Sequence, residues 1–404
     1  MNGKNILLGV TGGIAAYKTA FLVRLLVKKG ANVKVVMTDS AKEFVTPLTL
    51  ATLSKNEVYS SFTEEKDPDN FIEPKWNNHV ALALWADLFL IAPATANTLS
   101  KMANGNCDNL LLACYLSAKC PIYYAPAMDL DMYQHPSTAA TFEKLSNFGN
   151  IQIPAAFGEL ASGLVGQGRM AEPEDIVSFL ESDLASKLPL RGKKFLITAG
   201  PTYEAIDPVR FIGNHSSGKM GYAIAEATAQ LGAEVTLISG PSALNIENAN
   251  VKTIRVTSAE EMYLAAHVYF DNCDVAILSA AVADYRPAEI ATEKIKKKDE
   301  SLTLQLTKTK DILASLGEIK KKQFLVGFAL ETQNEEENAK LKLKKKNLDL
   351  IVLNSLRDEG AGFQTDTNKI TLIAKDNKTL PFPVKTKQEV AKDILEFIIE
   401  QTNA

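Results

Sequence analysis

Short, fully apolar runs alternate with amphipathic stretches from the start of the chain. Ile6–Val10 and Val33–Met37 have the length and composition of strands, and the spacing of apolar residues over Ala15–Lys29 predicts a helix between them. The loop Thr11-Gly12-Gly13 joins the first strand to this helix, and Gly30 follows the helix where a left-handed cap is expected. Strands without alternating polar residues are typical of parallel sheets that helices cover on both faces. The pattern therefore predicts an α/β fold.

The same pattern begins again near the middle of the chain. Phe195–Ala199 and Val235–Ile238 are predicted strands, and the helix predicted over Tyr222–Leu231 between them is followed by Gly232. Further strands are predicted at Leu88–Ala92, Ile122–Ala125, Val275–Ser279, Phe324–Phe328 and Leu350–Leu353. Two such starts indicate two doubly wound α/β domains with mostly parallel sheets, flavodoxin-like or Rossmann-like.

The boundary between the two domains is expected in Ser186–Gly192. This segment contains Pro and Gly and follows a helix predicted over Glu174–Leu184. We therefore expect domains at residues 1–190 and 191–404, which agrees with a chain length of 404 residues.

Composition narrows the class of protein. Lys and Arg total 44 and Asp and Glu total 48, so the net charge is −4 and there is no basic footprint for nucleic acid or an anionic membrane. Four cysteines without a C-x-x-C pair, and four histidines, do not indicate a disulfide scaffold or a zinc site. The longest apolar stretch, Val80–Ala96, is broken by Asp87 and Pro93 and is too short to span a bilayer. We expect a soluble, reduced, cytoplasmic protein.

Polar clusters follow several predicted strands, where open parallel sheets bind ligands. Gly12-Gly13 opens a helix and suits a phosphate, although it lacks the G-x-G-x-x-G spacing and is equally well a tight turn. Thr38-Asp39-Ser40 ends the second strand. An acidic residue there binds a ribose in dinucleotide enzymes, so an NAD-dependent oxidoreductase is an alternative. The loop Ala92–Thr98 could approach a planar ligand, or Thr95 or Asn97 could cap the helix around Leu99–Ala103.

The second half contains an incomplete phosphate-binding motif. Gly213–Met220 fits G-x-x-x-x-G-K, but Met220 replaces the hydroxyl residue that binds Mg²⁺, so a P-loop NTPase is not expected. Ser216–Lys219 is still a reasonable anion site at a helix start. The runs Lys294–Lys298 and Lys340–Lys346 are solvated faces or sites that neutralise a triphosphate.

Taken together, these segments resemble the family of bifunctional bacterial coenzyme A synthesis enzymes, phosphopantothenoylcysteine decarboxylase/phosphopantothenate–cysteine ligase. The resemblance covers essentially the whole chain. In the first half it rests on Gly12–Lys18, His79, Ala92–Thr98, Pro126-Ala127-Met128 and Gly168-Arg169-Met170. In the second half it rests on Thr198–Thr202, Asp207–Arg210, Asn214–Met220, Ala280–Tyr285, Lys294–Lys297 and Val326-Gly327-Phe328.

The resemblance implies a ligase in residues 191–404. CTP activates 4′-phosphopantothenate as an acyl-cytidylate, from which L-cysteine displaces CMP, and Mg²⁺ is expected with the triphosphate. Family matches place Asn214 and Lys294 at this chemistry. The implied substrate and nucleotide contacts are Leu278, Ser279, Ala280, Asp284, Lys294, Lys310, Asp311, Ile312, Leu313, Phe328, Lys342 and Lys346.

The resemblance implies an FMN-dependent decarboxylase in residues 1–190, which converts 4′-phosphopantothenoylcysteine to 4′-phosphopantetheine. His79 matches the family's essential histidine. The residues implied to hold FMN are Gly12, Gly13, Ile14, Thr38, Thr95, Asn97 and Thr98. The family also suggests a homo-oligomer.

Two departures from the family pattern concern catalysis. Asp129 stands where the motif has an asparagine, and Ser162 stands where the substrate-covering flap usually has a cysteine. We expect decarboxylation to persist and its final reduction step to be the one most affected. The alternative is a ligase fused to an impaired or regulatory flavoprotein domain, as in the halotolerance group.

Overall fold

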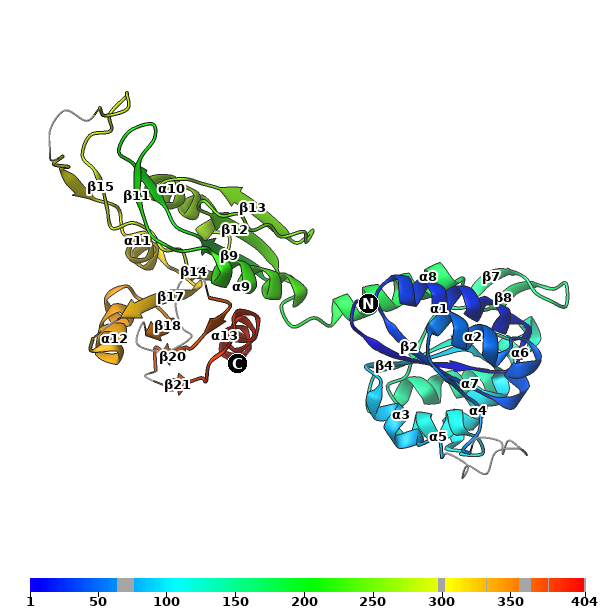
Figure 1. Cartoon of the computed structure of the whole chain (residues 1–404). Coiled ribbons are helices and arrows are strands. Elements are labelled where there is room, and N and C mark those ends of the chain that lie inside the picture. Colours follow the sequence, from blue (N-terminus) through cyan, green and yellow to red (C-terminus); the bar gives the residue numbers. More distant parts are fainter. Residues whose placement is uncertain (64–75, 297–301, 332, 356–364, 377, 403–404) are drawn as a thin grey trace, which may run out of the picture. The chain divides into compact units, whose positions relative to one another are not determined.

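The structure is a computed structural model that describes residues 1–63, 76–296, 302–331, 333–355, 365–376 and 378–402. Its contacts divide the chain into two compact units, Met1–Leu184 (unit 1) and Ala185–Ala404 (unit 2). Each unit is an α/β layered structure (Figure 1). No helix in the described ranges is long and apolar enough to cross a membrane.

Unit 1 is built on a parallel sheet with the strand order β3-β2-β1-β4-β5-β6. Its strands are β1 (Asn5–Val10), β2 (Asn32–Met37), β3 (Val58–Tyr59), β4 (Leu88–Ala94), β5 (Ile122–Pro126) and β6 (Ile151–Gln152). In the register of the central strands, Ile6 of β1 pairs with Val33 of β2 and with Leu88 of β4. The chain leaves β1 in one direction and returns to its other side at β4, which makes the end of β1 a switch point for ligand binding.

Helices cover both faces of this sheet because successive strand residues point to opposite sides. Leu8 packs with α1 (Thr19–Lys28), α2 (Pro47–Ser54) and α8 (Pro173–Ser186) in one core. Leu7 and Ile91 pack in the other core with α3 (His79–Trp85), α4 (Ala96–Asn104), α5 (Leu110–Ser117) and α7 (Pro136–Asn147). The shorter elements are the 3-10 helices η1 (Ile14–Lys18) and η2 (Asp39–Glu43), helix α6 (Leu130–Gln134), and the hairpin of β7 (Ala156–Glu159) and β8 (Val165–Arg169).

Unit 2 is built on a larger sheet with the strand order β13-β12-β9-β14-β17-β18-β20-β21. The parallel strands are β9 (Lys194–Ala199), β12 (Glu234–Ser239), β13 (Val251–Arg255), β14 (Val275–Leu278), β17 (Phe324–Glu331) and β18 (Leu350–Ser355). The edge strands β20 (Thr371–Ala374) and β21 (Thr379–Pro381) are antiparallel.

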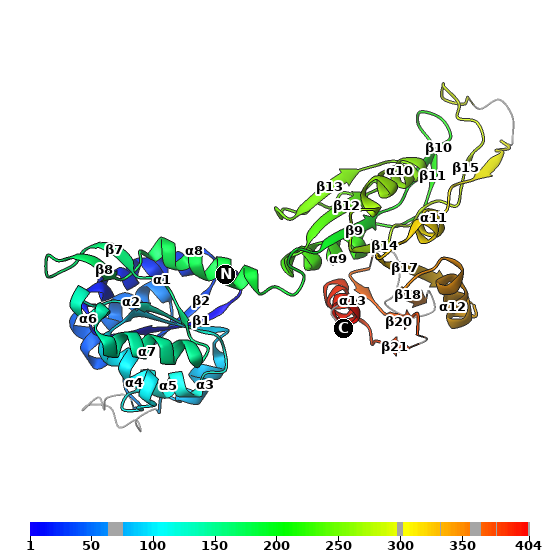
Figure 2. The same ribbon diagram turned by 180° about the vertical axis from the view of Figure 1, so that it is seen from behind.

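Helices again cover both faces of the sheet in unit 2 (Figure 2). One core contains α9 (Lys219–Gln230) and α13 (Lys387–Thr402), and the other contains α10 (Ala259–Phe270), α11 (Ile312–Ile319) and α12 (Glu335–Lys345). Three small hairpins lie outside the sheet: β10 (Tyr203–Ala205) with β11 (Phe211–Gly213), β15 (Tyr285–Pro287) with β16 (Leu306–Lys308), and β19 (Thr367–Asn368) with β22 (Lys385–Thr386).

The predicted fold class is confirmed, since both sheets are doubly wound and mostly parallel. The predicted helix 15–29 differs in its first turn, which is the 3-10 helix η1. There the N–H of Ala16 bonds to the carbonyl of Gly13 at 2.9 Å, and the hydroxyl of Thr19 donates to the carbonyl of Ala16 at 2.6 Å. The regular helix α1 begins only after these local bonds, at Thr19.

Candidate active sites

A cavity of about 870 Å³ lies at the carboxyl ends of the strands of unit 1. Strands β1, β2 and β4 each end beside it, and each is followed by a helical turn that begins at its edge: η1, η2 and α4. All seven residues expected to hold FMN line this cavity. The structure therefore brings together side chains from three separate stretches of sequence.

The helix starts around this cavity keep backbone N–H groups available. Among the described residues of unit 1, no side chain caps η1, η2 or α4 at their first residues. Thr95 precedes α4, but its hydroxyl is 3.4 Å from that of Thr98 and 3.3 Å from that of Thr11. Such N–H groups, together with the helix dipole, favour a phosphate. The alternative role for Thr95, a side-chain cap, is not what the structure shows.

Thr11 connects the ends of the two central strands, β1 and β4. The sequence alone suggested no role for it. Its side chain is fully buried, its hydroxyl donates to the carbonyl of Pro93 at 2.7 Å, and it accepts the N–H of Thr95 at 3.1 Å. Because the end of β1 is tied to the end of β4 in this way, the two loops lie side by side.

The absence of a side chain at Gly12 lets the backbone pass close to Ser40. A Cβ at Gly12 would lie 2.3 Å from Oγ of Ser40 and 2.9 Å from its carbonyl carbon, whereas a Cβ at Gly13 would meet only the methyl group of Thr95, at 3.3 Å. The backbone at Gly12 thus approaches η2 more closely than a side chain permits. A narrow cradle of hydroxyls and backbone amides fits a phosphorylated planar group such as FMN.

Lys18 connects η1 to the segment that directly follows the β7–β8 hairpin. It is 4% exposed, and its Nζ donates to the carbonyl of Met170 at 3.1 Å and to Oε1 of Glu172 at 2.8 Å. Arg169 donates to the same oxygen at 2.8 Å. The hydrogen bond from Lys18 is the main cause that lowers the pKa of Glu172, and it outweighs the effect of burial. The motifs around Lys18 and Arg169 therefore meet at one ion-pair network on the cavity wall.

Asp129 lines the same cavity at the start of α6. Its Oδ1 accepts the N–H of Leu130 at 2.7 Å, and the preceding N–H, of Met128, donates to the carbonyl of Gly168 at 3.0 Å. A Cβ at Gly168 would lie 2.4 Å from the carbonyl oxygen of Met128. The close approach of β8 therefore fixes the segment that carries Asp129 at the cavity wall.

Ser162 lies at the exposed tip of the β7–β8 hairpin. The cavity is lined by residues 159–161 but not by Ser162, whose Oγ accepts the N–H of Leu164 at 3.4 Å. Gly163 follows in the left-handed region, with φ of 85°. The structure places this serine beside the site and not within it.

His79 lies outside this cavity. It begins α3, and the edges of the rings of Phe62 and Trp76 meet its ring at centroid distances of 6.1 Å. Its Nδ1 is buried and makes no hydrogen bond among the described residues. The structure of one chain does not join His79 to the FMN residues, and its catalytic role stays a prediction.

In unit 2 a cleft of about 530 Å³ lies at the carboxyl ends of β9, β14 and β17. Its lining contains most of the contacts expected for the nucleotide: Leu278, Ala280, Asp284, Lys310, Asp311, Ile312, Leu313, Phe328 and Lys346. Ser279 lines a neighbouring pocket of about 160 Å³, which shares Ala280 and Phe328 with the cleft. The two spaces are therefore adjacent.

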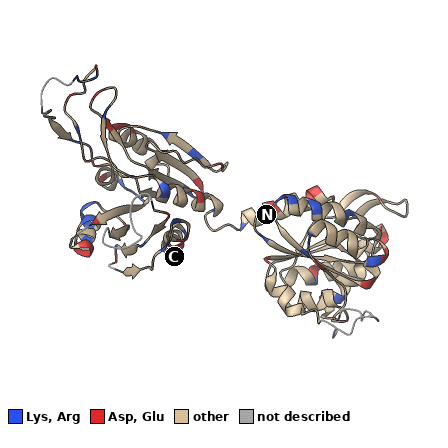
Figure 3. Ribbon diagram, viewed as in Figure 1, with Lys and Arg blue, Asp and Glu red and all other residues tan. Residues whose placement is uncertain are grey.

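Two of the lysines that line the cleft are already paired with carboxylates. Lys310 contacts Glu260 at 2.7 Å, and Lys346 contacts Asp311 at 2.8 Å. Burial raises the pKa of Asp311, but its bonds to Lys346 and to the N–H of Ala314 outweigh burial and lower it. Helix α12 has acidic residues in its first turn and lysines in its last (Figure 3). Lys342, in that last turn, pairs with Glu331 and does not line the cleft.

The smaller pocket is an anion site in its chemistry. Helix α9 begins there at Lys219 after Gly218, whose φ is 82°, and Lys219 pairs with Asp366 at 2.6 Å. Lys387, 6% exposed, also lines it; burial and the charge of Lys219 lower its pKa, and Asp366 partly offsets this. These lysines, at the starts of α9 and α13, suit a phosphate chain that extends from the neighbouring cleft.

The two expected catalytic residues of unit 2 come from loops above the sheet. Asn214 follows β11, and its Nδ2 donates to the carbonyls of Ala281 and Val282 at 3.0 and 3.1 Å, which places it against the cleft segment 280–282. Lys294 is exposed and does not line the cleft. Its role stays a prediction, and Lys297 and Lys298 of the same run lie outside the described residues.

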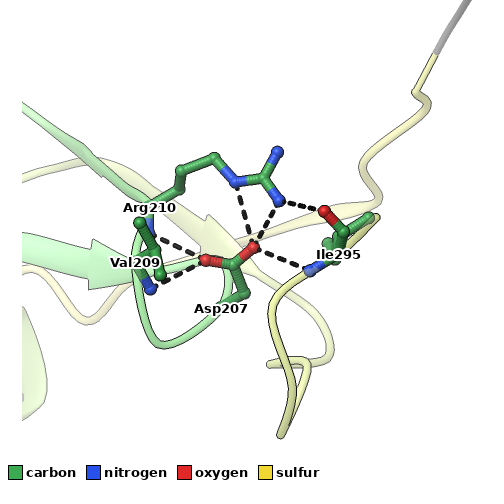
Figure 4. A network of polar contacts seen from close by, with 4 residues as sticks. All are labelled: Asp207, Val209, Arg210 and Ile295. Carbon is green, nitrogen blue, oxygen red and sulfur yellow. Dashed lines mark hydrogen bonds and ion pairs between the residues drawn. The ribbon is translucent and has the colours of Figure 1, made fainter. Parts of the chain in front are cut away.

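A buried carboxylate holds the segment that carries Lys294 (Figure 4). Asp207 is 2% exposed, and it binds the side chain of Arg210 and the backbone of Ile295. Sequence reasoning matched the motif Asp207–Arg210 but assigned it no task, because no spacing rule links it to a residue more than eighty positions away.

Two sequence-family models match the chain. The one described as Flavoprotein matches residues 1–185, and the one described as DNA/pantothenate metabolism flavoprotein C-terminal domain matches residues 190–402.

Known proteins match most of the chain. The Coenzyme A biosynthesis bifunctional protein CoaBC of Bacillus subtilis (strain 168) is 48% identical over 400 residues, which cover 98% of this chain and 97% of the relative. A protein of an unknown prokaryotic organism, called Cysteine/Cysteine sulfinic acid decarboxylase, is 54% identical over 360 residues, covering 88% of this chain and 99% of the relative. The solved C-terminal domain of a CoaBC protein shares 46% identity and a TM-score of 0.47, covering 54% of this chain and 99% of that one.

Proposed function

The chain belongs to the CoaBC family of bifunctional coenzyme A biosynthesis proteins, and we propose that it catalyses both reactions expected from the sequence. Unit 2 ligates 4′-phosphopantothenate with L-cysteine at the expense of CTP, and unit 1 decarboxylates the 4′-phosphopantothenoylcysteine that results. The observation that carries this proposal is that each unit has a cavity at its strand ends: the one in unit 1 is lined by all seven residues expected to hold FMN, and the cleft in unit 2 by most of the residues expected to contact the nucleotide.

In unit 1, Gly12, Gly13 and Ile14 would bind the FMN phosphate through the backbone at the start of η1. Thr38, Thr95, Asn97 and Thr98 would hold the rest of the group by hydrogen bonds. FMN, when bound, supplies a reversible acceptor for two electrons of the substrate. The protein orients the substrate, and the exposed β7–β8 hairpin would cover it from above.

Asp129 lines this cavity at the start of α6, where the family pattern has an asparagine. A carboxylate there would repel the carboxylate that the substrate must lose, so we expect the side chain of Asp129 to rotate toward a cation when the substrate binds. Arg169 lines the same cavity and is such a cation.

In unit 2, the cleft would hold the base and ribose, and the pocket at α9 would hold the phosphates. The carboxylate of 4′-phosphopantothenate attacks the α-phosphorus, pyrophosphate leaves, and the amine of cysteine then attacks the acyl carbon while CMP leaves. Lys294 would stabilise the negative charge that develops in the first step, and Asn214 would orient the acyl group.

Mg²⁺ would enter with the triphosphate. No group of three or more His, Cys, Asp or Glu side chains in the described residues could hold a metal ion by itself. Mg²⁺ commonly binds through substrate phosphates and one or two carboxylates, and Asp284 at the cleft is available as such a carboxylate.

The relative called Cysteine/Cysteine sulfinic acid decarboxylase favours a second candidate, in which unit 1 decarboxylates a free amino acid. Both candidates are tested with one purified preparation. The protein is expected to show a flavin spectrum, to release CMP from CTP, 4′-phosphopantothenate and cysteine, and to release CO₂ in the same mixture.

Each incomplete result selects one alternative. CMP without CO₂ indicates a ligase fused to an impaired flavoprotein domain. CO₂ from cysteine or cysteine sulfinate alone, without CTP, supports the second candidate. A spectrum of bound NAD in place of flavin would support the oxidoreductase.

A further inference from the structure

The turn between β10 and β11 contains a carboxylate whose two oxygens have separate partners. Oδ1 of Asp207 accepts the N–H groups of Val209 and Arg210, each at 2.8 Å, and so closes the turn itself. Oδ2 accepts Nε and Nη2 of Arg210 at 3.0 and 2.6 Å and the N–H of Ile295 at 3.1 Å. Only the second oxygen reaches outside the turn (Figure 4).

The segment that Oδ2 reaches is held at both ends. Nη2 of Arg210 donates to the carbonyl of Ile295 at 2.7 Å, so both backbone groups of Ile295 are bound. The N–H of Ala291 donates to the carbonyl of Ile206 at 3.0 Å. Lys294 lies between these two attachments, and its side chain is exposed with no hydrogen bond or ion pair among the described residues.

The same turn leads directly to the other catalytic residue. Strand β11 runs from the turn to Gly213, and Asn214 follows, bound to the carbonyls of Ala281 and Val282. Two loops that are far apart in the sequence, one with Asn214 and one with Lys294, therefore meet at a single buried carboxylate.

We propose that Asp207 is a positioning residue: together with Arg210 it fixes the segment 291–295, and hence Lys294, relative to the hairpin that leads to Asn214. The proposal rests on the proposed ligase reaction, in which Lys294 meets the activated carboxylate. A carboxylate needed only for the turn would use Oδ1. Burial of a carboxylate costs free energy unless hydrogen bonds or an opposite charge compensate it. At Asp207 part of that compensation comes from Ile295, which lies outside the turn.

Ionisation of Asp207 is consistent with this role. Burial raises the pKa of its carboxyl, but the hydrogen bonds from Val209, Arg210 and Ile295 outweigh burial and hold the pKa well below its usual range. The carboxylate is therefore charged at neutral pH and accepts from every partner.

The test is Asp207→Asn in the full chain. The Oδ1 of an asparagine can still accept the N–H groups of Val209 and Arg210 that close the turn. Its Nδ2 is a donor, so it cannot accept hydrogen bonds from the side chain of Arg210 or the N–H of Ile295. We expect pyrophosphate release from CTP and 4′-phosphopantothenate, measured without cysteine, to slow about 10²-fold while the Kd of CTP changes by less than about threefold. Arg210→Lys keeps the charge but loses the paired contacts, and it should slow the same step about tenfold.

A matched control lies at the opposite end of the strands. Asp349 accepts the N–H of Leu325 at 2.8 Å and Nζ of Lys320 at 2.9 Å, a comparable carboxylate network that contacts neither catalytic loop. Asp349→Asn should lower the melting temperature as Asp207→Asn does, while pyrophosphate release per folded molecule stays at the wild-type rate.

A second readout needs no activity. Cleavage of the Lys294–Ile295 bond by trypsin, followed by mass spectrometry, should be at least about tenfold faster in Asp207→Asn than in the wild type and unchanged in Asp349→Asn. If the wild type releases no pyrophosphate, the proposed ligase function fails, and this comparison still decides whether Asp207 holds the segment. The proposal would be overturned if trypsin cleaved Asp207→Asn no faster than the wild type. It would also be overturned if Asp349→Asn slowed pyrophosphate release as much as Asp207→Asn does.

Discussion

In unit 1 the seven residues expected to hold FMN offer the cavity hydroxyls and backbone N–H groups at helix starts, and the paired cations Lys18, Lys101 and Arg169 lie elsewhere on its wall. In unit 2 the residues expected to bind the nucleotide include lysines that already contact carboxylates. The two cavities lie at the same place in similar sheets, beyond the carboxyl ends of parallel strands. The first site is formed before its ligand arrives. In the second site we expect Lys–carboxylate contacts to be exchanged for Lys–phosphate contacts when the nucleotide binds.

This difference suits the two ligands. A tightly held cofactor gains from a site that needs no rearrangement, because no ordering of side chains opposes binding. A nucleotide that is consumed in each cycle must also leave, and carboxylates that recapture the lysines help to release its products. The predictions below test this contrast, beginning with the largest expected effect.

Lys294→Gln should slow acyl-cytidylate formation about 10²–10³-fold, because it removes a charge expected at the developing negative charge. The measurement is pyrophosphate release from CTP and 4′-phosphopantothenate. Lys340→Gln is the matched control, since Lys340 lies on α12 and pairs with Glu336 one turn earlier. Equal losses in both variants would mean that the lysines act only as bulk charge.

Gly12→Ala should lower the FMN affinity at least about tenfold, because its Cβ would lie 2.3 Å from Oγ of Ser40 and 2.9 Å from the Ser40 backbone. Gly13→Ala is the graded control, since its Cβ would meet only the Thr95 methyl group at 3.3 Å. Flavin absorbance after gel filtration measures both. Full flavin content in Gly12→Ala would show that the loop can move, and that the site is not preformed.

The seven residues that the sequence suggested for FMN lie around one cavity for a physical reason, while their binding of FMN stays a prediction. Every FMN residue follows the end of a predicted strand, and parallel strands bring their ends to one edge. The partners of these residues were not predictable in the same way. Thr11 binds Pro93 and Lys18 binds Glu172 across more than eighty positions, and no local periodicity reports such contacts.

The residues that the sequence suggested for the second site are less closely grouped in the structure. Residues beside strand ends, such as Ala280 and Phe328, line the cleft as expected, but Lys342 and Lys294 do not. Both residues belong to lysine-rich stretches, in which composition does not indicate which single lysine side chain points into a site. The fold class was predictable because long apolar runs indicate buried parallel strands. The antiparallel edge strands β20 and β21 have only four and three residues, which is too short for a periodic pattern to identify them.

Salt should separate the two sites directly. Raising the ionic strength from about 0.05 M to about 0.5 M should weaken CTP binding about tenfold and FMN binding no more than about twofold, because side-chain charges in an open cleft are screened more than backbone dipoles in a lined cavity. Isothermal titration with each ligand measures this. If salt weakened the binding of CTP and FMN equally, the proposed contrast between a site that binds through lysine side chains and one that binds through backbone groups would be wrong.

The smallest effect is expected at Ser162. A serine hydroxyl is a far weaker acid than a cysteine thiol, whose pKa is about 8.5, so it should protonate the enethiolate product of decarboxylation poorly. Its position agrees with a minor role, since Ser162 is exposed at the hairpin tip and does not line the cavity. Ser162→Ala should therefore change 4′-phosphopantetheine formation by less than about twofold, while Ser162→Cys should speed the final reduction and leave CO₂ release unchanged. Ser137→Ala, at an exposed serine beside His135, controls for a general effect of removing a hydroxyl. Loss of 4′-phosphopantetheine in Ser162→Ala with flavin still bound would make the serine a true proton donor, and the hairpin would then have to bring it into the cavity.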